Sequence, residues 1–343
     1  MQLLFLIACL WIFSHEVYAA ATIADADKWI QTDLSSTTIS SNSLDQHELG
    51  RLLFFDPRLS NQVRSCATCH HPGLGWADAS AHPMGSKNAL QRHTPTLVNI
   101  AFAKRFFWDG RGTTLEKSIA EHITSLNVIH GEKHDVIQNI RHLQQYREQF
   151  KEIFAKQDID LQQISAAIAT FIRSISSGST PFDRWIAGDS SAISNNAKRG
   201  FHLFTHKARC HHCHNSPNFS DNKFHYIGLN SIDPGRFEIT KKDTDMNAFK
   251  TPNLRHIAVT APYMHDGSKP DLKSVIEFYN RGGDQQNAHN KLIPLLLSDT
   301  EKNDLLHFLY SLTGENTEVI VPTLPTNIQI PRQLLNPSFK NVL

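Results

Sequence analysis

Two short stretches of the sequence carry the same rare pattern: SCATCHHPGLG at residues 65–75 and RCHHCHNSPNF at residues 209–219. In each stretch two cysteines are separated by two residues, and a histidine follows at once. The two sets are Cys66, Cys69 and His70, and Cys210, Cys213 and His214. This spacing is typical of covalent haem c attachment, in which the cysteine sulfurs bond the vinyl groups and the histidine binds the iron.

Zinc binding, disulfide formation and a redox dithiol are the other common uses of such cysteines. The chain has five cysteines, and Cys9 lies in an apolar N-terminal run, so the two motifs hold all the others. Two copies of one pattern favour haem over zinc, and neither copy follows a clear strand as a thioredoxin-like pair would. We therefore predict two covalently bound haem c groups, with a zinc-binding structural protein as the alternative.

The first nineteen residues have the features of a secretory signal peptide. An apolar run spans residues 3–13, and Val17-Tyr18-Ala19 fits a small-x-Ala cleavage site. We expect residues 1–19 to be removed, the mature chain to be periplasmic, and no transmembrane span to remain, since the apolar run is too short to cross a bilayer. Cys9 ends a LIAC sequence, which leaves a lipid anchor as the alternative.

The composition fits a globular protein without a nucleic-acid partner. Hydrophobic residues make up 40% of the 343, enough for real cores, and the formal net charge is only +1. A nucleic-acid-binding protein or a strongly basic membrane-surface protein would show a marked basic excess.

Helical periodicity dominates the sequence. Apolar residues from Ile164 to Ile175 recur at helical spacing in a segment that ends near 176–178, and Ser298 with Glu301 forms a capping box before another apolar face that ends at Gly314. The two motifs lie 144 residues apart. We predict a mostly α protein with two cytochrome c-like haem domains, residues 20–176 and 177–343, and an extended tail from Glu318.

Around both motifs the sequence resembles the bacterial dihaem cytochrome c peroxidase and MauG family. The resemblance runs from Leu49 to Gly314 and includes LGRLLFFDPRLS, RHTPTLVN, FFWDGR, FDRW, FKTPNLRHIAVTAPYMHDG, VIEFYNRGG and LLHFLYSLTG. It implies a peroxide-reacting haem at His70 and an electron-transferring haem at His214. It also implies hydrogen peroxide and a protein electron donor or protein substrate as partners.

The resemblance also bears on the second ligand of each iron. Family members that take electrons from a small cytochrome have a methionine fourteen residues after the histidine of the HDG segment, and here that position is Tyr279. Tyrosine there is the pattern of MauG and its relatives, which implies a His214/Tyr279 haem; tyrosinate stabilises ferric iron. Met264 is the competing ligand, and helix packing is the other role open to Tyr279. The removable distal histidine of the peroxidases corresponds to Ser86, so we expect a five-coordinate first iron, with a ligand from the nearby His82 or Met84 as the alternative.

Trp108 and its neighbours match the family segment that lies between the two haems. The resemblance implies that Trp108 relays electrons between them, with plain aromatic packing as the alternative. Arg111 is expected to pair with a haem propionate or a carboxylate.

The family's distal glutamate, which moves protons during peroxide cleavage, corresponds to Val128, which cannot do so. Glu121, His122, His130 and Glu132 are the alternatives, and we select Glu121 and His130 as candidate catalytic residues.

The family also implies a calcium ion between the domains, bound by the backbone carbonyls of Thr260 and Pro262 and by an asparagine side chain. The asparagine position reads His93. Calcium prefers oxygen ligands, so the site is absent, completed by water, or displaced toward Asn99. The surface tryptophan at which the protein substrate of MauG docks corresponds to Ala208.

Two functional classes follow from these observations. The first is an exported dihaem oxidoreductase that either oxidises a residue of a partner protein, as MauG does, or removes peroxide with electrons from a small cytochrome. The second is a non-enzymatic dihaem electron carrier or haem sensor, which the missing glutamate favours and the open first haem opposes.

Overall fold

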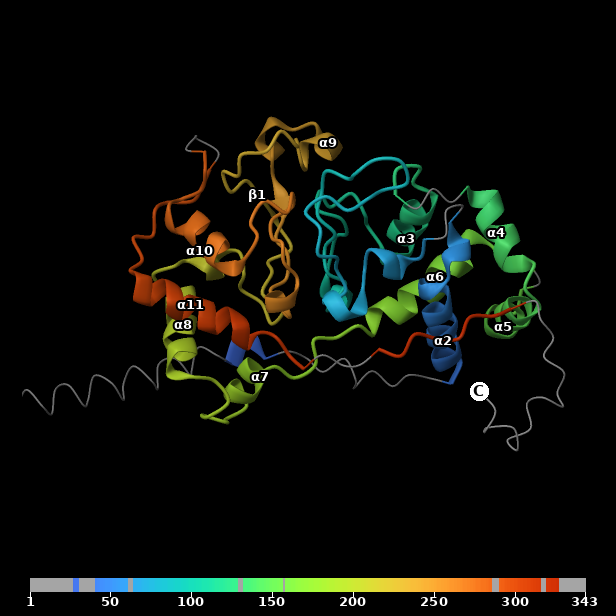
Figure 1. Ribbon diagram of the computed structural model, residues 1–343, viewed down its shortest axis with the longest axis horizontal. Helices are drawn as coiled ribbons and strands as arrows, with labels where there is room; N and C mark the ends of the chain where they lie inside the picture. Colours follow the sequence, from blue (N-terminus) through green and yellow to red (C-terminus); the bar gives the residue numbers. More distant parts are fainter. Residues whose placement is uncertain are drawn as a thin grey trace, which may run out of the picture.

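The computed structural model describes residues 27–30, 41–60, 64–128, 132–156, 158–285, 290–315 and 319–326. Within these ranges the chain is mostly helical (Figure 1). The helices of the first half are α2 (Ser41–Phe55), α3 (Leu115–Thr124), α4 (Lys133–Arg141), α5 (Gln144–Phe154) and α6 (Leu161–Arg173). Those of the second half are α7 (Pro181–Ile186), α8 (Asn195–Thr205), α9 (Phe237–Thr240), α10 (Leu272–Asn280) and α11 (Asp299–Ser311). Strands β1 (Phe224–His225) and β2 (Phe249–Lys250) pair antiparallel.

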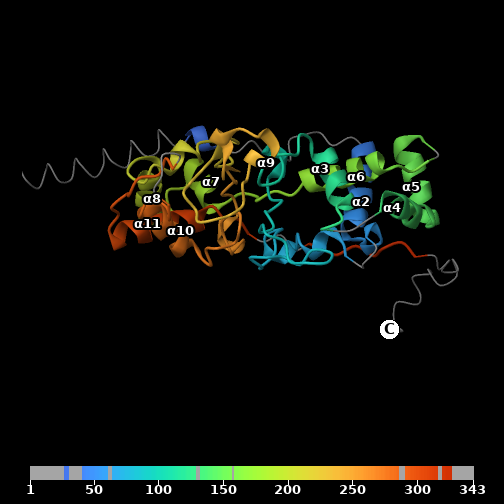
Figure 2. The same cartoon turned by 90° about the horizontal axis from the view of Figure 1, so that it is seen from above.

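Two lobes lie side by side, as Figures 1 and 2 show from two directions. One buried apolar cluster is formed by helices α2, α3, α4, α5 and α6 and includes Phe54 and Ile168. A second is formed by α7, α8, α10 and α11 and includes Phe201 and Phe308. The prediction of a mostly α protein with two cytochrome c-like units is confirmed. The exact boundary at residues 176 and 177 stays a prediction.

Each lobe is built on one close helix crossing at a glycine. A Cβ atom on Gly50 of α2 would lie 1.9 Å from the carbonyl oxygen of Ala167 in α6, and one on Gly200 of α8 would lie 2.0 Å from that of Asp304 in α11. No side chain fits in either gap, so only glycine lets these backbones touch. Both glycines stand four residues before a buried phenylalanine, in GRLLF and GFHLF.

The two helices predicted from periodicity and capping are present. The side chain of Asp160 caps α6, which ends at Arg173, a few residues earlier than expected because tight turns replace α-helical bonds at Ser174 and Ile175. The capping box of Ser298 and Glu301 begins α11 as predicted.

The described parts of the two chain ends cross between the lobes. Trp29 is fully buried in the second lobe, stacked on Phe219 at 4.9 Å between ring centroids. The tail at residues 319–326 runs along the first lobe (Figure 1), where the carbonyls of Ile320 and Pro325 accept hydrogen bonds from Arg51 and Arg58, each at 2.8 Å. The segment predicted to belong to the first domain therefore contributes Trp29 to the core of the second.

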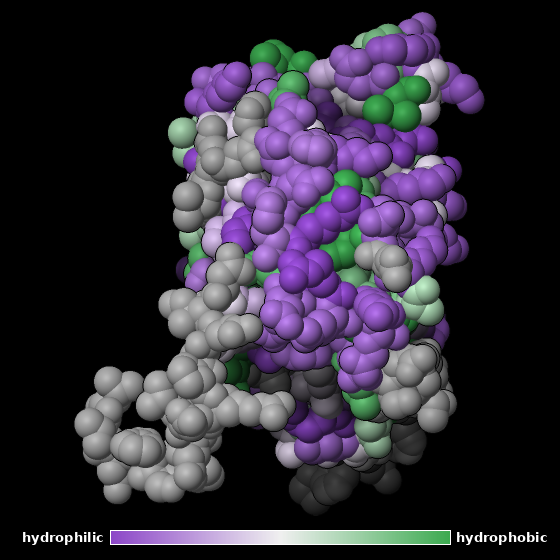
Figure 3. Space-filling view, turned by 90° about the vertical axis from the view of Figure 1, so that its right-hand side faces the viewer, coloured by the Kyte–Doolittle hydropathy of each residue, from purple (hydrophilic) through white to green (hydrophobic). Residues whose placement is uncertain are grey.

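No helix among the described residues is both long and apolar enough to cross a membrane. Residues 1–19, which carry the predicted signal sequence and Cys9, lie outside the described part of the chain. Figure 3 faces the end of the molecule that carries α4 and α5, where hydrophilic side chains cover most of the coloured surface.

Candidate haem sites

The two cysteine motifs fold into the same turn. Cys66–Thr68 and Cys210–His212 are single 3-10 turns. In each, the backbone N–H of the histidine donates to the carbonyl of the first cysteine at 2.9 Å, His70 to Cys66 and His214 to Cys210. None of the four cysteines is paired in a disulfide, which argues against the alternative of two disulfides.

Both motif histidines are oriented by a backbone carbonyl. The Nδ1 atom of His70 lies 3.1 Å from the carbonyl oxygen of Trp76, and that of His214 lies 2.6 Å from the carbonyl oxygen of Phe219. Since a carbonyl only accepts, Nδ1 carries the proton and Nε2 keeps a free lone pair, as a metal-binding histidine requires. Burial lowers the pKa of both imidazoles, that of His214 to about 4, so both rings are neutral.

A cavity of about 480 Å³ opens beside the second motif. Its size falls in the range of roughly 300–1,000 Å³ that small-molecule and cofactor sites occupy. Cys210, Cys213 and His214 line one part of it, and apolar side chains such as Phe204 and Leu305 line the rest. Two thiols, a neutral imidazole and a mainly apolar wall suit a covalently attached haem.

Both candidate second ligands of the second iron line this same cavity. Tyr279 belongs to α10, and Met264 belongs to a loop and has a φ of +73°. Burial, and then the neighbouring sulfurs of Cys210 and Cys213, raise the pKa of the Tyr279 phenol. The phenol therefore keeps its proton unless a cation lies against its oxygen.

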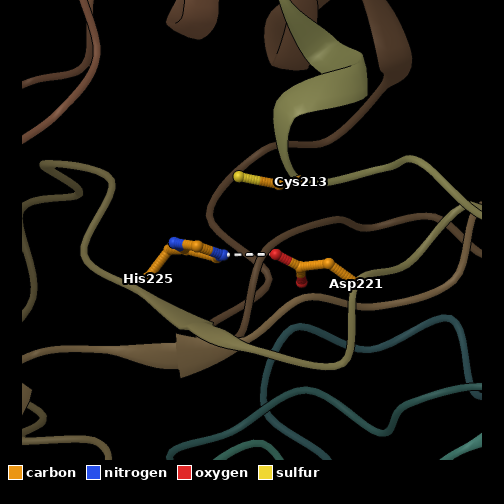
Figure 4. A group of neighbouring side chains, drawn as sticks. All are labelled: Cys213, Asp221 and His225. Atoms are coloured by element: carbon orange, nitrogen blue, oxygen red, sulfur yellow. Dashed lines mark hydrogen bonds and ion pairs between the residues drawn. The ribbon is translucent and has the colours of Figure 1, made fainter.

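Among the described residues, one group of three metal-binding side chains has its ligand atoms within 4.8 Å of one another. It consists of Cys213, Asp221 and His225. Figure 4 shows the His225 ring directed at the Asp221 carboxylate, with Nε2 and Oδ2 2.8 Å apart. Burial raises the pKa of the Cys213 thiol to about 11, which disfavours the thiolate that zinc needs. The cluster lies at the haem attachment point, and the first motif forms no comparable group in the described residues.

A histidine that the sequence-based selection passed over lies opposite the first motif. The ring of His122 in α3 is centred 6.3 Å from the ring of His70 and stacks on Phe107 at 6.2 Å. Burial, followed by the charges of His70 and Arg111, lowers the pKa of His122 to about 3. His122 is therefore a neutral imidazole at the first site.

The two selected candidates are placed differently. The Glu121 side chain is 49% exposed and accepts a 2.6 Å hydrogen bond from Nε of Arg111, which also binds Asp109 at 2.8 Å. His130 lies outside the described residues. Helical register separates Glu121 from His122, because His122 shares the i, i+4, i+7, i+8 stripe with Leu115, Ile119 and Ile123. This signal in the sequence could have identified His122.

Trp108 lies where the first lobe meets the second. Its indole N–H donates to the carbonyl of His93 at 2.8 Å, and its own carbonyl accepts from the backbone N–H of Lys250 in β2 at 2.9 Å. Trp108 lines the second cavity, while the adjacent Phe107 stacks on His122 at the first site. The two aromatic neighbours thus connect both sites.

The residues at the expected calcium position do not fit that ion. His93 is 5% exposed, and its Nδ1 lies 2.9 Å from the carbonyl oxygen of Ser80, so a nitrogen ring fills the place of the amide oxygen. The amide of Asn99 is already bonded at both ends to Ser177, each at 3.1 Å. Thr260 and Pro262 line the haem cavity beside His93, but the oxygen donor set is incomplete.

Comparison with known proteins agrees with this geometry. Residues 45–191 match the family model described as di-haem cytochrome c peroxidase. The methylamine utilization protein MauG of Methylorubrum extorquens is 40% identical over 284 residues, which cover 81% of this chain and 80% of the relative. The cytochrome c551 peroxidase of Nitrosomonas europaea is 30% identical and covers 92% of this chain and 93% of its own length.

The fold likewise matches a solved structure. A MauG-like protein associated with microbial copper homeostasis superposes with a TM-score of 0.73 at 28% identity, over 83% of this chain and 93% of that protein. Sequence, site geometry and fold agree, and the chain belongs to the dihaem cytochrome c peroxidase and MauG family of peroxidase-type oxidoreductases.

Proposed function

We propose that the protein is a periplasmic enzyme that uses hydrogen peroxide to oxidise a residue of a partner protein, as MauG does. The observation that carries this proposal is Tyr279, which lines the cavity of His214 at the position where cytochrome-fed peroxidases have methionine. A phenolate is a hard anionic donor that favours oxidised iron, whereas methionine raises the potential and suits uptake of electrons from a small cytochrome.

The chain offers a complete set of residues for two haems. Cys66, Cys69 and His70 would hold the first, and Cys210, Cys213, His214 and Tyr279 the second. Bound haem c supplies the iron that reacts with peroxide and exchanges electrons. The protein supplies neutral histidines fixed by the carbonyls of Trp76 and Phe219, and an apolar wall that excludes water.

Trp108 supplies the connection between the two sites. Its ring lines the second cavity and donates to the His93 carbonyl of the first lobe, while its backbone carbonyl accepts from Lys250 of the second lobe. Phe107, the next residue along the chain, contacts His122 at the first site. An indole at this place is suited to pass an electron from the second site toward the first.

Removal of peroxide with a small cytochrome as donor is the second candidate function. Ala208, at the position of the docking tryptophan of MauG, is 4% exposed, so this chain offers no aromatic side chain there for a protein substrate. Any protein partner must therefore exchange electrons by another route, and a small cytochrome needs only close approach to the second haem.

Rapid mixing of the diferric holoprotein with hydrogen peroxide separates these functions. We expect the Soret bands of both haems to change together, and the changed spectrum to persist when no donor is present. We also expect a reduced small c-type cytochrome to be oxidised slowly. In Tyr279→Met, oxidation of the cytochrome should become faster. Fast cytochrome oxidation by the wild type, unchanged in the variant, would establish the second function instead. Absence of any spectral response to peroxide would contradict both.

A further inference from the structure

The rings of His70 and His122 lie close together and belong to different elements of the first lobe. His70 follows the turn Cys66–Thr68, and His122 lies in the last turn of α3. Their ring centroids are 6.3 Å apart and their planes are inclined by 51°. No hydrogen bond joins the two rings, and no residue in the described part of the chain hydrogen-bonds to the ring of His122. Within that part of the chain, the protein therefore leaves the nitrogens of His122 without a hydrogen-bond partner.

The separation distinguishes an iron ligand from a proton-transferring residue. A nitrogen ligand lies about 2 Å from its metal, so the centre of an imidazole ring lies about 3 Å away and two rings on one metal lie about 6 Å apart. A histidine that acted on a bound peroxide would stand further off, because the peroxide must fit between it and the iron. The observed 6.3 Å matches two ligands on one iron. We propose that His122 binds the first haem iron on the face opposite His70.

The ring of His122 is held in place by a stack of side chains. Phe107 stacks on it with the two ring planes inclined by 24°. The Phe107 ring also contacts the guanidinium of Arg111, which lies 3.7 Å from the ring centroid. Arg111 is fixed in turn by Asp109 and Glu121. Phe107 adopts φ of +64°, a conformation that costs a non-glycine residue free energy.

This assignment changes the expected resting state of the first site. The serine at position 86 predicts a five-coordinate iron open to peroxide, whereas a His70/His122 pair gives a six-coordinate, low-spin iron. The assignment rests on the proposed function, in that it needs a haem at Cys66, Cys69 and His70. With haem bound, the His122 nitrogen would have to be displaced before peroxide could bind, an exchange of one neutral ligand for another in which no electron moves.

Electron paramagnetic resonance and near-infrared magnetic circular dichroism of the diferric holoprotein test the assignment. The wild type should show two low-spin haems and a bis-histidine charge-transfer band. In His122→Ala one low-spin signal should be replaced by a high-spin signal of the same intensity, and added imidazole should restore it. Cyanide should bind the first haem of the variant faster than that of the wild type.

Two matched variants and a haem count separate the outcomes. His134→Ala and His142→Ala, at exposed histidines in and directly after α4, should keep the wild-type spectra. A stoichiometric high-spin signal in the wild type, or an unchanged spectrum in His122→Ala, would overturn the assignment, and the wild-type spectra decide the matter even if the variant loses haem. A pyridine haemochrome count below two haems per wild-type chain would instead overturn the proposed function.

Discussion

At the scale of single residues, the two sites use one arrangement with different surroundings. His70 and His214 each donate Nδ1–H to a carbonyl five or six residues later in the chain, and each follows the same 3-10 turn. The spacing of the cysteines and histidines predicted haem attachment, because the chemistry of attachment is local, but it did not predict the carbonyls that orient the two rings. The spacing also could not indicate the residue near His70, because His122 belongs to a helix about fifty residues away in the sequence.

Calcium dependence is decided at His93. The imidazole fills the position of an oxygen ligand and is bonded to the Ser80 carbonyl, so we expect neither EDTA nor added calcium to change the Tm or the haem spectra of the wild type. His93→Asn restores an amide oxygen and should give a Tm that rises with calcium. Thermal unfolding followed at the Soret band, with and without EDTA, measures both. Loss of low-spin signals from the wild type in EDTA would show that calcium is bound through other ligands.

The relay proposed for Trp108 is also a single-residue property. Trp108→Phe keeps an aromatic ring but removes the hydrogen bond to the His93 carbonyl and the more easily oxidised indole. After peroxide addition, the second haem of this variant should respond later than the first, whereas the two respond together in the wild type. Trp185→Phe, in the core of the second lobe, is the control and should behave as the wild type. Simultaneous responses in Trp108→Phe would exclude the indole as the route.

At the scale of elements, each lobe depends on the crossing of one helix pair. In Gly200→Ala the added Cβ would meet the Asp304 carbonyl oxygen at 2.0 Å, so α8 and α11 must separate. Overpacking of this kind costs about 1–3 kcal/mol of unfolding free energy. Gly50→Ala should cost a similar amount at α2 and α6. Denaturant unfolding measures these losses.

A glycine without neighbours provides the control for these crossings. Gly178→Ala meets no atom within 4 Å, although its φ of +61° adds backbone strain. It should therefore cost less than either crossing variant. Equal losses in all three would mean that helix separation is not what destabilises the protein.

The elements also show what could be read from the sequence and why. The capping box of Ser298 and Glu301 and the apolar stripe of α6 are short-range patterns, and both gave helices at the expected places. The role of the glycines was missed, because the short pattern shared by GRLLF and GFHLF does not show which helix each glycine meets, and only the crossing geometry reveals it. In α3 the stripe of Leu115, Ile119 and Ile123 contained the information needed to prefer His122 over Glu121.

At the scale of the whole molecule, the described parts of the chain ends join the two lobes. Trp29 is stacked on Phe219, the residue whose carbonyl orients His214. The backbone carbonyl of Trp29 accepts a hydrogen bond from the buried Arg255 at 3.2 Å. Local patterns could not predict this, since the packing partners lie nearly two hundred residues apart.

Removal of the Trp29 ring should therefore act on the second lobe. Truncation of a buried tryptophan costs about 3–5 kcal/mol, so Trp29→Ala should lower the Tm and disturb the low-spin signal of the second haem before that of the first. Ile30→Ala, at a neighbouring side chain that is 55% exposed, should have little effect. Equal disturbance of both haems in Trp29→Ala would indicate that the two lobes unfold as one unit.

Oxidation of a partner protein, as proposed here, requires that His214 and Tyr279 both bind the second haem. Electron paramagnetic resonance of the diferric holoprotein in Tyr279→Phe tests it most directly, with Met264→Leu and the exposed Tyr310→Phe as controls. With Tyr279 as the ligand, Tyr279→Phe alone should lose the low-spin signal of the second haem while the haem count stays at two. An unchanged signal in Tyr279→Phe together with its loss in Met264→Leu would exclude Tyr279 and assign the methionine as the ligand.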